Sequence, residues 1–104
     1  MHDSHAYEML GVCVAKGYTG AYIEVLGGGA LGVTIPLSDN YYGLLTSDYG
    51  LGVYEQEHFE YTGEPVDSFD FLFDDEYEPK TPIWDQTAKA LFWLTEMAKA
   101  KGWN

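Results

Sequence analysis

The expected fold follows from residues 68–74, which read SFDFLFD, and from the helix-like segment that begins a few residues later. In SFDFLFD the three phenylalanines fall at every second position, while Asp70 and Asp74 belong to the opposite set of positions. Side chains of a β-strand alternate between its two faces. This stretch therefore predicts a strand with one buried face and one solvated face.

The C-terminal segment predicts an amphipathic helix. Thr81 is a possible N-cap, and Pro82 suits the first helical position, where its missing N–H costs nothing. Gly102 is a natural residue to end the helix. Asp85 and Lys89 form an i,i+4 pair in the favourable order. Apolar residues recur between these ends at intervals of three and four, so one face of the helix is expected to be buried.

The two patterns together predict the core. The residues expected to be buried are Phe69, Phe71, Phe73, Trp84, Leu91 and Leu94. Phe92, Trp93 and Met97 widen the apolar face of the helix beyond a single stripe. We therefore expect the helix to lie across a sheet and to be covered further by a loop or a partner.

The middle of the chain predicts further strands. Residues 21–26 and 30–35 are rich in strand-forming side chains on either side of Gly27-Gly28-Gly29, which indicates a β-hairpin. Residues 52–61 are another strand candidate, with a turn at residues 62–65.

The N-terminal segment leaves two alternatives. Ser4 could cap a helix that stops at Gly17, but residues 11–14, GVCV, suit a strand equally well. Residues 4–10 slightly favour a helix. The whole chain, residues 1–104, is expected to form a single α+β domain. We expect an antiparallel sheet of about four to five strands with the C-terminal amphipathic helix packed on one face.

Composition excludes several classes of protein. The chain has 17 acidic residues and 5 basic residues, all lysine, and its formal net charge is −12. A protein that binds nucleic acid directly needs a basic patch, and arginine is its preferred reader of phosphates and base edges. Direct binding to nucleic acid and binding to anionic lipid are therefore both unexpected.

The predicted location is the cytoplasm. No apolar run approaches the ~20 residues that span a bilayer. The first five residues, MHDSH, have neither the basic nor the apolar region of a signal peptide. Cys13 is the only cysteine and cannot form an internal disulfide, which fits a reducing compartment.

No motif in the chain names a reaction. Gly27, Gly29 and Gly32 match G-x-G-x-x-G, but a strand follows them where a dinucleotide site needs a helix N-terminus. Residues 74–78 lack the alternating ligands and the glycine of a calcium loop. Cys13 lies between two valines and is expected to be buried and inert. We therefore expect no enzymatic activity, no metal site and no cofactor.

The acidic charge is concentrated in the middle of the chain. Between Asp48 and Glu78 there are 11 acids and no base. Such a density produces self-repulsion that solubility alone does not require, and it creates a field able to steer a cationic partner. Four tyrosines lie in the same stretch and Tyr41 and Tyr42 shortly before it, and tyrosine supplies stiff contact area with a polar tip.

These features predict a surface that imitates nucleic acid. DNA carries about one charge per 1.7 Å of its axis. Strands that place carboxylates every ~6.7 Å, at a strand spacing of ~4.8 Å, approach that density. The predicted partner is a basic DNA- or RNA-binding protein, with no direct contact to nucleic acid or membrane. The candidate contact residues are Glu55, Glu57, Glu60, Asp70, Asp74, Asp75, Glu76 and Glu78, with Tyr54 and Tyr77 as possible anchors.

In its size, its charge, its lack of arginine and its tyrosine-rich acidic middle, the chain resembles the small acidic inhibitors of phages and mobile elements. These are the anti-CRISPR proteins and the antirestriction DNA mimics. Residues 5–10, HAYEML, are also similar to a stretch of a phage antirestriction decoy. That decoy family is all-helical, so its fold is not carried over. The resemblance implies an inhibitor that blocks the DNA-binding groove of a bacterial defence complex, such as a CRISPR effector.

The same features fit two other functions. An immunity protein or antitoxin that neutralises a basic nuclease toxin would use the same electrostatics. A structural or assembly protein would instead use the apolar face of the C-terminal helix. The sequence leaves the target and the oligomeric state open.

Overall fold

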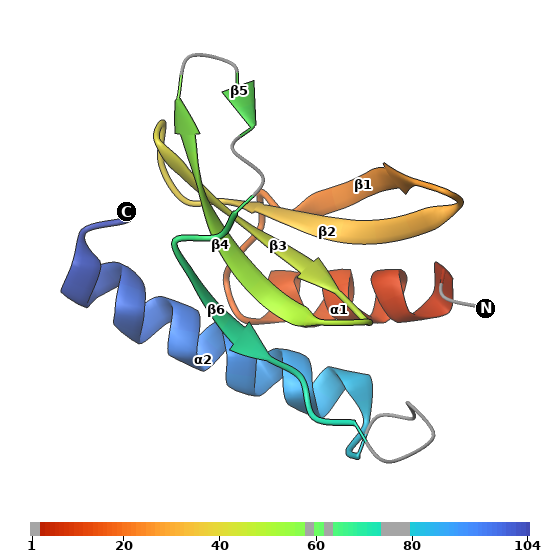
Figure 1. The fold of residues 1–104 in the computed structure, drawn as a ribbon. Helices are drawn as coiled ribbons and strands as arrows, with labels where there is room; N and C mark the ends of the chain where they lie inside the picture. The colour runs from red at the N-terminus through yellow and green to blue at the C-terminus, as the bar shows by residue number, and fades with distance from the viewer. Residues whose placement is uncertain (1–2, 58–59, 62–63, 74–79) are drawn as a thin grey trace.

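The computed structural model describes residues 3–57, 60–61, 64–73 and 80–104. These residues form two helices and six strands (Figure 1). In chain order they are α1 (Asp3–Ala15), β1 (Tyr22–Gly27), β2 (Ala30–Pro36), β3 (Tyr41–Thr46), β4 (Gly50–Glu57), β5 (Glu60–Tyr61), β6 (Asp67–Asp70) and α2 (Ile83–Lys101).

The strands form one antiparallel sheet. β1, β2, β3 and β4 follow one another as neighbours, joined by hairpins. The second edge of β4 is shared by two strands. β6 pairs with the first half of β4, where Leu51 lies opposite Phe69, and β5 pairs with its end, where Glu57 lies opposite Glu60. The predicted α+β class and antiparallel sheet are confirmed.

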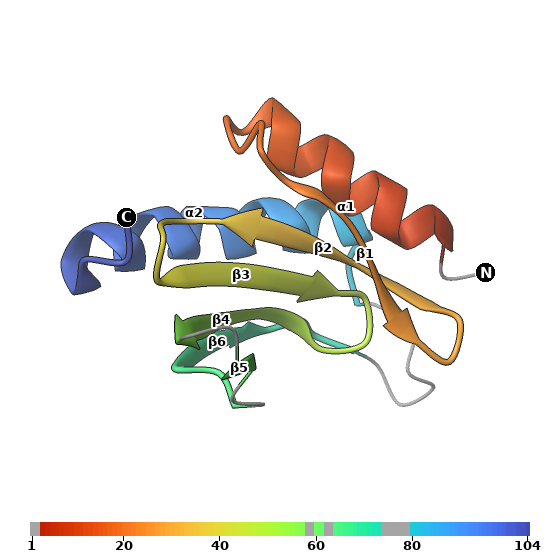
Figure 2. The ribbon, with the colours of Figure 1, turned by 90° about the horizontal axis from the view of Figure 1, so that it is seen from above.

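Both helices cover the same face of this sheet (Figures 1 and 2). α1 packs against β1, β2 and β3, and α2 packs against β4, β6 and α1. The core lies between the two layers and is built from every second residue of the strands. Its fully buried side chains include Met9 and Cys13 of α1, Val33, Ile35, Leu45 and Val53 of the sheet, and Leu94 of α2. In the part of the chain that the structure describes, no helix lies on the opposite face of the sheet.

The hairpin at residues 27–29 is confirmed, one predicted strand is corrected, and one open alternative is resolved. The strand predicted over residues 52–61 is two strands, because the chain reverses after Glu57 and β5 pairs back onto β4. The open alternative at residues 11–14 resolves as helix, because α1 continues to Ala15. Within this stretch Cys13 faces the core while Val14 is 48% exposed.

The strand predicted over residues 68–74 is shorter than expected. β6 ends at Asp70, although the alternation continues and Phe71 is 4% exposed. Phe71 N–H donates to the carbonyl of Tyr49. The next residue, Leu72, bonds through its N–H and its carbonyl to the side chain of Gln86. A helix side chain therefore takes the place of a neighbouring strand at this point.

The ends of α2 are close to the prediction. Pro82 is the N-cap rather than the first helical residue, and Thr81 does not cap the helix. Gly102 adopts the left-handed conformation, with φ of 74°, and its N–H donates to Ala98 O. Asp85 and Lys89 form the expected ion pair, at 3.4 Å.

The prediction that Trp84 is buried is wrong, since its exposed fraction is 53%. The buried stripe of α2 begins one residue earlier, at Ile83, and continues through Thr87 and Leu94. One residue corresponds to a rotation of about 100° about the helix axis, which turns Trp84 away from the sheet. Leu91 and Leu94 are buried as expected, while Phe69 and Phe73 are half-buried against the core.

Candidate functional site

Charge is divided between the two layers of the fold. All five lysines lie on α2 or beside a helix end: Lys16, Lys80, Lys89, Lys99 and Lys101. The sheet segment from Tyr22 to Asp70 contains nine acids and no lysine. Its acids are Glu24, Asp39, Asp48, Glu55, Glu57, Glu60, Glu64, Asp67 and Asp70. Among the described residues the only ion pair is Lys89–Asp85, within the helix layer. The carboxylates described in the sheet layer are therefore not neutralised by lysine.

The helix-free face of the sheet is defined by strand alternation. Leu45, Leu51 and Val53 point into the core, so their strand neighbours Leu44 and Gly52 point to the opposite side. Residues that lie directly opposite each other on neighbouring strands point to the same face, so strand pairing identifies the other residues of the free face. Thr34 of β2, Leu44 of β3, Gly52 of β4 and Ser68 of β6 form one row across four strands.

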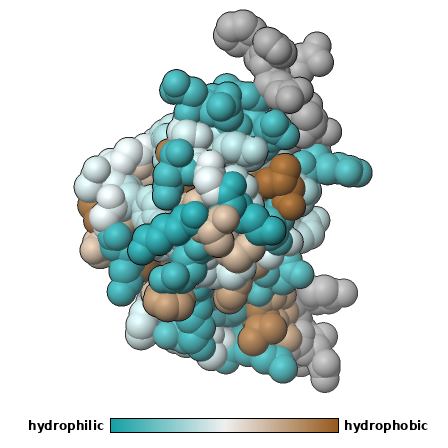
Figure 3. Space-filling model, turned by 90° about the vertical axis from the view of Figure 1, so that its left-hand side faces the viewer, coloured by the Kyte–Doolittle hydropathy of each residue, from teal (hydrophilic) through white to brown (hydrophobic). Residues whose placement is uncertain are grey.

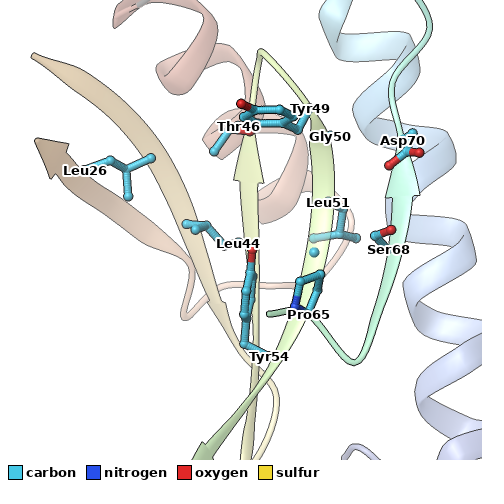
Figure 4. Close-up of a pocket in the computed structure, with 11 residues that line it drawn as sticks. Leu26, Leu44, Thr46, Tyr49, Gly50, Leu51, Tyr54, Pro65, Ser68 and Asp70 are labelled. Carbon is cyan, nitrogen blue, oxygen red and sulfur yellow. The ribbon is translucent and has the colours of Figure 1, made fainter. Parts of the chain in front are cut away.

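A hollow of about 490 Å³ lies on this free face (Figure 4). Its lining comes from β1, β3, β4 and β6, from the turn before β4 and from the segment before β6. The residues that line it are Leu26, Leu44, Thr46, Tyr49, Gly50, Leu51, Gly52, Tyr54, Pro65, Ser68 and Asp70. In Figure 4, Tyr54 runs alongside β4 with Pro65 beside it, and Ser68 and Asp70 lie on the neighbouring strand β6.

Two glycines of β4 make this hollow possible. A Cβ added at Gly52 would lie 2.9 Å from Cε1 of Tyr54, so the tyrosine ring leans over the bare backbone. A Cβ added at Gly50 would lie 2.4 Å from the carbonyl oxygen of Phe69, and the φ of Gly50 is 122°. Glycine at these positions lets the Tyr54 ring and strand β6 approach β4 closely.

The Tyr54 ring is held by its cross-strand neighbour. Tyr42 of β3 lies directly opposite Tyr54, and the two rings stack with centroids 5.5 Å apart and planes 18° from parallel. Aromatic cross-strand pairs stabilise a sheet and fix the orientation of both rings. One face of Tyr54 is thereby covered by Tyr42, while the ring also lines the hollow.

The structure brings two of the sequence-predicted contact residues together, since Tyr54 and Asp70 both line the hollow. Glu55 is half-buried and, by alternation, lies on the helix side of β4, opposite Tyr41. Glu57 and Glu60 are cross-strand partners in the β4–β5 hairpin. The remaining candidates fall outside the described residues: Asp74, Asp75, Glu76, Tyr77 and Glu78.

Sequence reasoning missed most of the hollow because it missed β3. Leu44 and Thr46 belong to that strand, and Tyr49 lies in the turn that follows it. The feature of the sequence that indicates the hollow is the pair of glycines Gly50 and Gly52, since glycine inside a strand marks a close approach of another group. Tyr49 is 76% exposed, which makes it the most exposed tyrosine reported among the described residues.

A second exposed surface lies on α2. An apolar hollow of about 580 Å³ runs along the helix, and Phe92 in its lining is 71% exposed. Its lining residues are Phe69, Ala88, Lys89, Phe92, Trp93, Glu96 and Met97. At the end of the molecule that carries the C-terminus, Figure 3 shows separate hydrophobic groups within a mainly hydrophilic surface. We name the α2 surface around Phe92, Trp93 and Met97 the α2 face.

The described residues contain neither a metal-binding cluster nor a membrane-spanning helix. Within the described ranges, no three or more histidine, cysteine or acidic side chains are grouped so that they could hold a metal ion. No helix in the described part of the chain is long and apolar enough to cross a membrane. Cys13 is fully buried as expected, and its burial raises the pKa of its thiol to about 12.

Comparison with known proteins gives no relative for this arrangement. The chain matches no protein-family model, no curated protein sequence and no solved structure.

Proposed function

We propose that this protein is a non-enzymatic inhibitor whose acidic sheet layer occupies the nucleic-acid groove of a bacterial defence protein, such as a CRISPR effector, in the cytoplasm. The observation that carries the proposal is the division of charge between the layers. Nine acids and no lysine lie between Tyr22 and Asp70, and all five lysines lie in or beside the helices.

The electrostatics of this layer suit a basic partner. Carboxylates gathered in a layer that carries no lysine create a field that accelerates association with a cationic surface. Alternate residues of a strand lie about 6.7 Å apart and neighbouring strands about 4.8 Å apart, so carboxylates on adjacent strands approach the charge density of nucleic acid. Such a surface competes for a DNA-binding groove and offers no phosphodiester bond to cleave.

The free face also supplies a centre for the interface. Interfaces are held by a few anchor side chains in packed pockets, while charges at the rim govern association rate and salt sensitivity. Tyr54 and Tyr49 line the hollow, and exposed carboxylates of Asp48, Glu64 and Asp70 lie on or beside its lining residues. The hollow is therefore the expected centre, and these three acids belong to its rim.

The experiment is a capture followed by a competition. The tagged protein is used to capture a partner from bacterial lysates that contain DNA-defence systems, and the purified partner is then assayed for DNA binding. We expect the partner to lose DNA binding in proportion to the inhibitor added. A partner that binds DNA equally well in the presence of saturating inhibitor would contradict it.

A second candidate function is favoured by the α2 face. Phe92 is 71% exposed beside an apolar hollow, and Lys89 and Glu96 are equally spaced on either side of the Phe92–Trp93 pair. Two copies packed antiparallel through α2 would bring Lys89 of each copy close to Glu96 of the other. Two copies of this acidic protein should also repel each other least when they meet through their helix layers, because these layers carry the lysines.

This assembly function is tested by the molar mass in solution, measured by light scattering. A dimer that becomes a monomer on Phe92→Glu supports it. Tyr7→Glu on α1 is the matched control, because Tyr7 is also exposed, at 61%. A wild-type protein that stays monomeric at the highest concentration reached would rule out assembly through this face.

A further inference from the structure

We infer that the hollow on the free face of the sheet is a binding site for a guanidinium group, supplied by an arginine side chain of a protein partner. The source of the arginine rests on the proposed function, while the chemistry of the site rests on its own lining. The hollow has a volume of about 490 Å³, within the usual range of about 300–1,000 Å³ for ligand sites. It therefore has room for a long side chain and for part of the peptide beside it.

The aromatic lining favours a flat cation. The Tyr54 ring is fixed by its stack on Tyr42 at 5.5 Å and lines the hollow. Tyr49 lines the hollow from the turn before β4 and is 76% exposed. The face of an aromatic ring attracts cations, and the planar guanidinium stacks on it more effectively than a compact ammonium does.

The polar lining supplies hydrogen-bond acceptors. The carboxylate of Asp70 lines the hollow, is exposed, and makes no ion pair within the described part of the chain. The hydroxyl oxygens of Ser68 and Thr46 are further potential acceptors in the lining. A guanidinium carries five N–H donors and no acceptor, and it pairs with a carboxylate through two parallel hydrogen bonds.

The remaining lining fits the stem of the same side chain. Leu26 and Leu44 approach each other over Gly32, since a Cβ added at Gly32 would meet both leucine side chains within 3.3 Å. Methylene stems of arginine pack along apolar surface while the charged head stays near water and its partner. An anion is disfavoured, because the sheet segment around the hollow carries nine acids and no lysine.

The test uses a short peptide with isolated arginines and two matched peptides, one with lysine and one with uncharged citrulline at the same positions. Binding is followed by NMR shifts of the backbone amides of the protein. The expected result is that the arginine peptide binds most tightly and that the largest shifts occur at Gly50, Gly52, Tyr54, Ser68 and Asp70. If the protein binds the lysine peptide and the arginine peptide with equal affinity, the assignment of a guanidinium site is wrong.

Two acid-to-amide variants locate the site. Asp70→Asn removes the carboxylate in the hollow, and Asp39→Asn makes the same charge change at an exposed turn outside its lining. Asp70→Asn should weaken binding of the arginine peptide by about tenfold, the size of one charge-assisted interaction. Asp39→Asn should weaken binding of the same peptide by at most about twofold. Equal losses in the two variants would mean that the peptide senses only the general field.

A third variant changes the shape of the hollow without changing charge. Gly52→Ala adds a Cβ 2.9 Å from the Tyr54 ring, so the ring must shift. Weaker binding of the arginine peptide with an unchanged melting temperature supports the site, and unchanged binding contradicts it. The two proposals fail separately. If basic peptides bind but ignore Asp70 and Gly52, the guanidinium site is wrong and the acidic-surface proposal stands; if no basic peptide binds, both are wrong.

Discussion

Gln86 of α2 bonds through both ends of its side-chain amide to the backbone of Leu72. Leu72 N–H donates to Gln86 Oε1 at 2.6 Å, and Gln86 Nε2 donates to Leu72 O at 3.0 Å. Gln86 is 4% exposed. This amide occupies the place that a strand partner would take after β6 ends at Asp70, and it connects the helix layer to the edge of the sheet.

Replacement of Gln86 by leucine should therefore destabilise the fold. The change leaves the N–H of Leu72 without its partner, while the carbonyl of Leu72 keeps the hydrogen bond that Lys80 N–H donates to it. The expected cost is about 1–3 kcal/mol in the free energy of unfolding. Urea denaturation measures this cost. Gln56→Leu, at an exposed position of β4, is the control, and equal small losses in the two variants would show that the Gln86 bonds contribute nothing.

Phe71 and Trp84 should differ sharply on truncation to alanine. Phe71 is 4% exposed within the core, so Phe71→Ala should reduce the free energy of unfolding by about 3–5 kcal/mol. Trp84 is 53% exposed, so Trp84→Ala should reduce it by less than about 1 kcal/mol. Denaturant melts of both variants test which face of α2 is turned toward the sheet. A larger loss in the free energy of unfolding for Trp84→Ala than for Phe71→Ala would mean that the helix is rotated from the orientation described.

Cys13 should be unreactive in the folded protein. Its side chain is fully buried and its pKa is raised to about 12, so little thiolate is present or accessible near neutral pH. A chromogenic thiol reagent should label the native protein slowly and the urea-unfolded protein at once. Rapid labelling of the native protein would show that α1 opens readily from the sheet.

The same thiol predicts a loss of stability at high pH. The pKa of Cys13 is raised from 9.0 to about 12 on folding, so between these values the native state holds a proton that the unfolded state releases. Stability therefore falls as pH rises above 9, by at most about 1.4 kcal/mol per pH unit from this group. In the Cys13→Ala variant the free energy of unfolding should fall less steeply above pH 9. An identical pH dependence of unfolding in wild type and variant would contradict the raised pKa of Cys13.

Much of the fold could be predicted from local patterns. The alternation in SFDFLFD and the glycine-rich hairpin fix their own geometry, because strand faces and turn conformations depend on nearby residues. The rotation of α2 could not be predicted in the same way. Apolar residues such as Trp84, Phe92 and Trp93 lie around much of the helix, so only its packing partners decide which ones are buried.

The candidate site depended more strongly on long-range pairing. The hollow exists because β3 and β6 flank β4, so that Tyr42 stacks on Tyr54 and Asp70 lies opposite Gly50. Those neighbours are set by strand order and register, which the alternation of a single strand does not encode. The concentration of acids in the middle of the chain, in contrast, is evident from the sequence itself.

Binding to the partner should depend strongly on salt. Charges on exposed surfaces are screened over about 10 Å at 0.1 M ionic strength, so raising salt from about 50 to about 200 mM should slow association and weaken the complex. The association rate constant, measured by stopped flow, is the relevant quantity. A complex held mainly by the apolar α2 face would show little change over this range.

The most direct test of the central claim compares two variants of this protein, each with two acids changed to lysine, in their binding to the captured partner. Asp48→Lys with Asp70→Lys alters exposed acids of the sheet layer, and Glu8→Lys with Glu96→Lys makes the same net charge change on exposed acids of the helices. The measured quantity is the affinity of each variant for the partner. We predict that the sheet-layer variant binds about 100-fold more weakly while the helix-layer variant stays within a few-fold of wild type. Equal losses in the two variants, or a larger loss from the helix-layer pair, would contradict the claim that the acidic sheet layer is the binding surface.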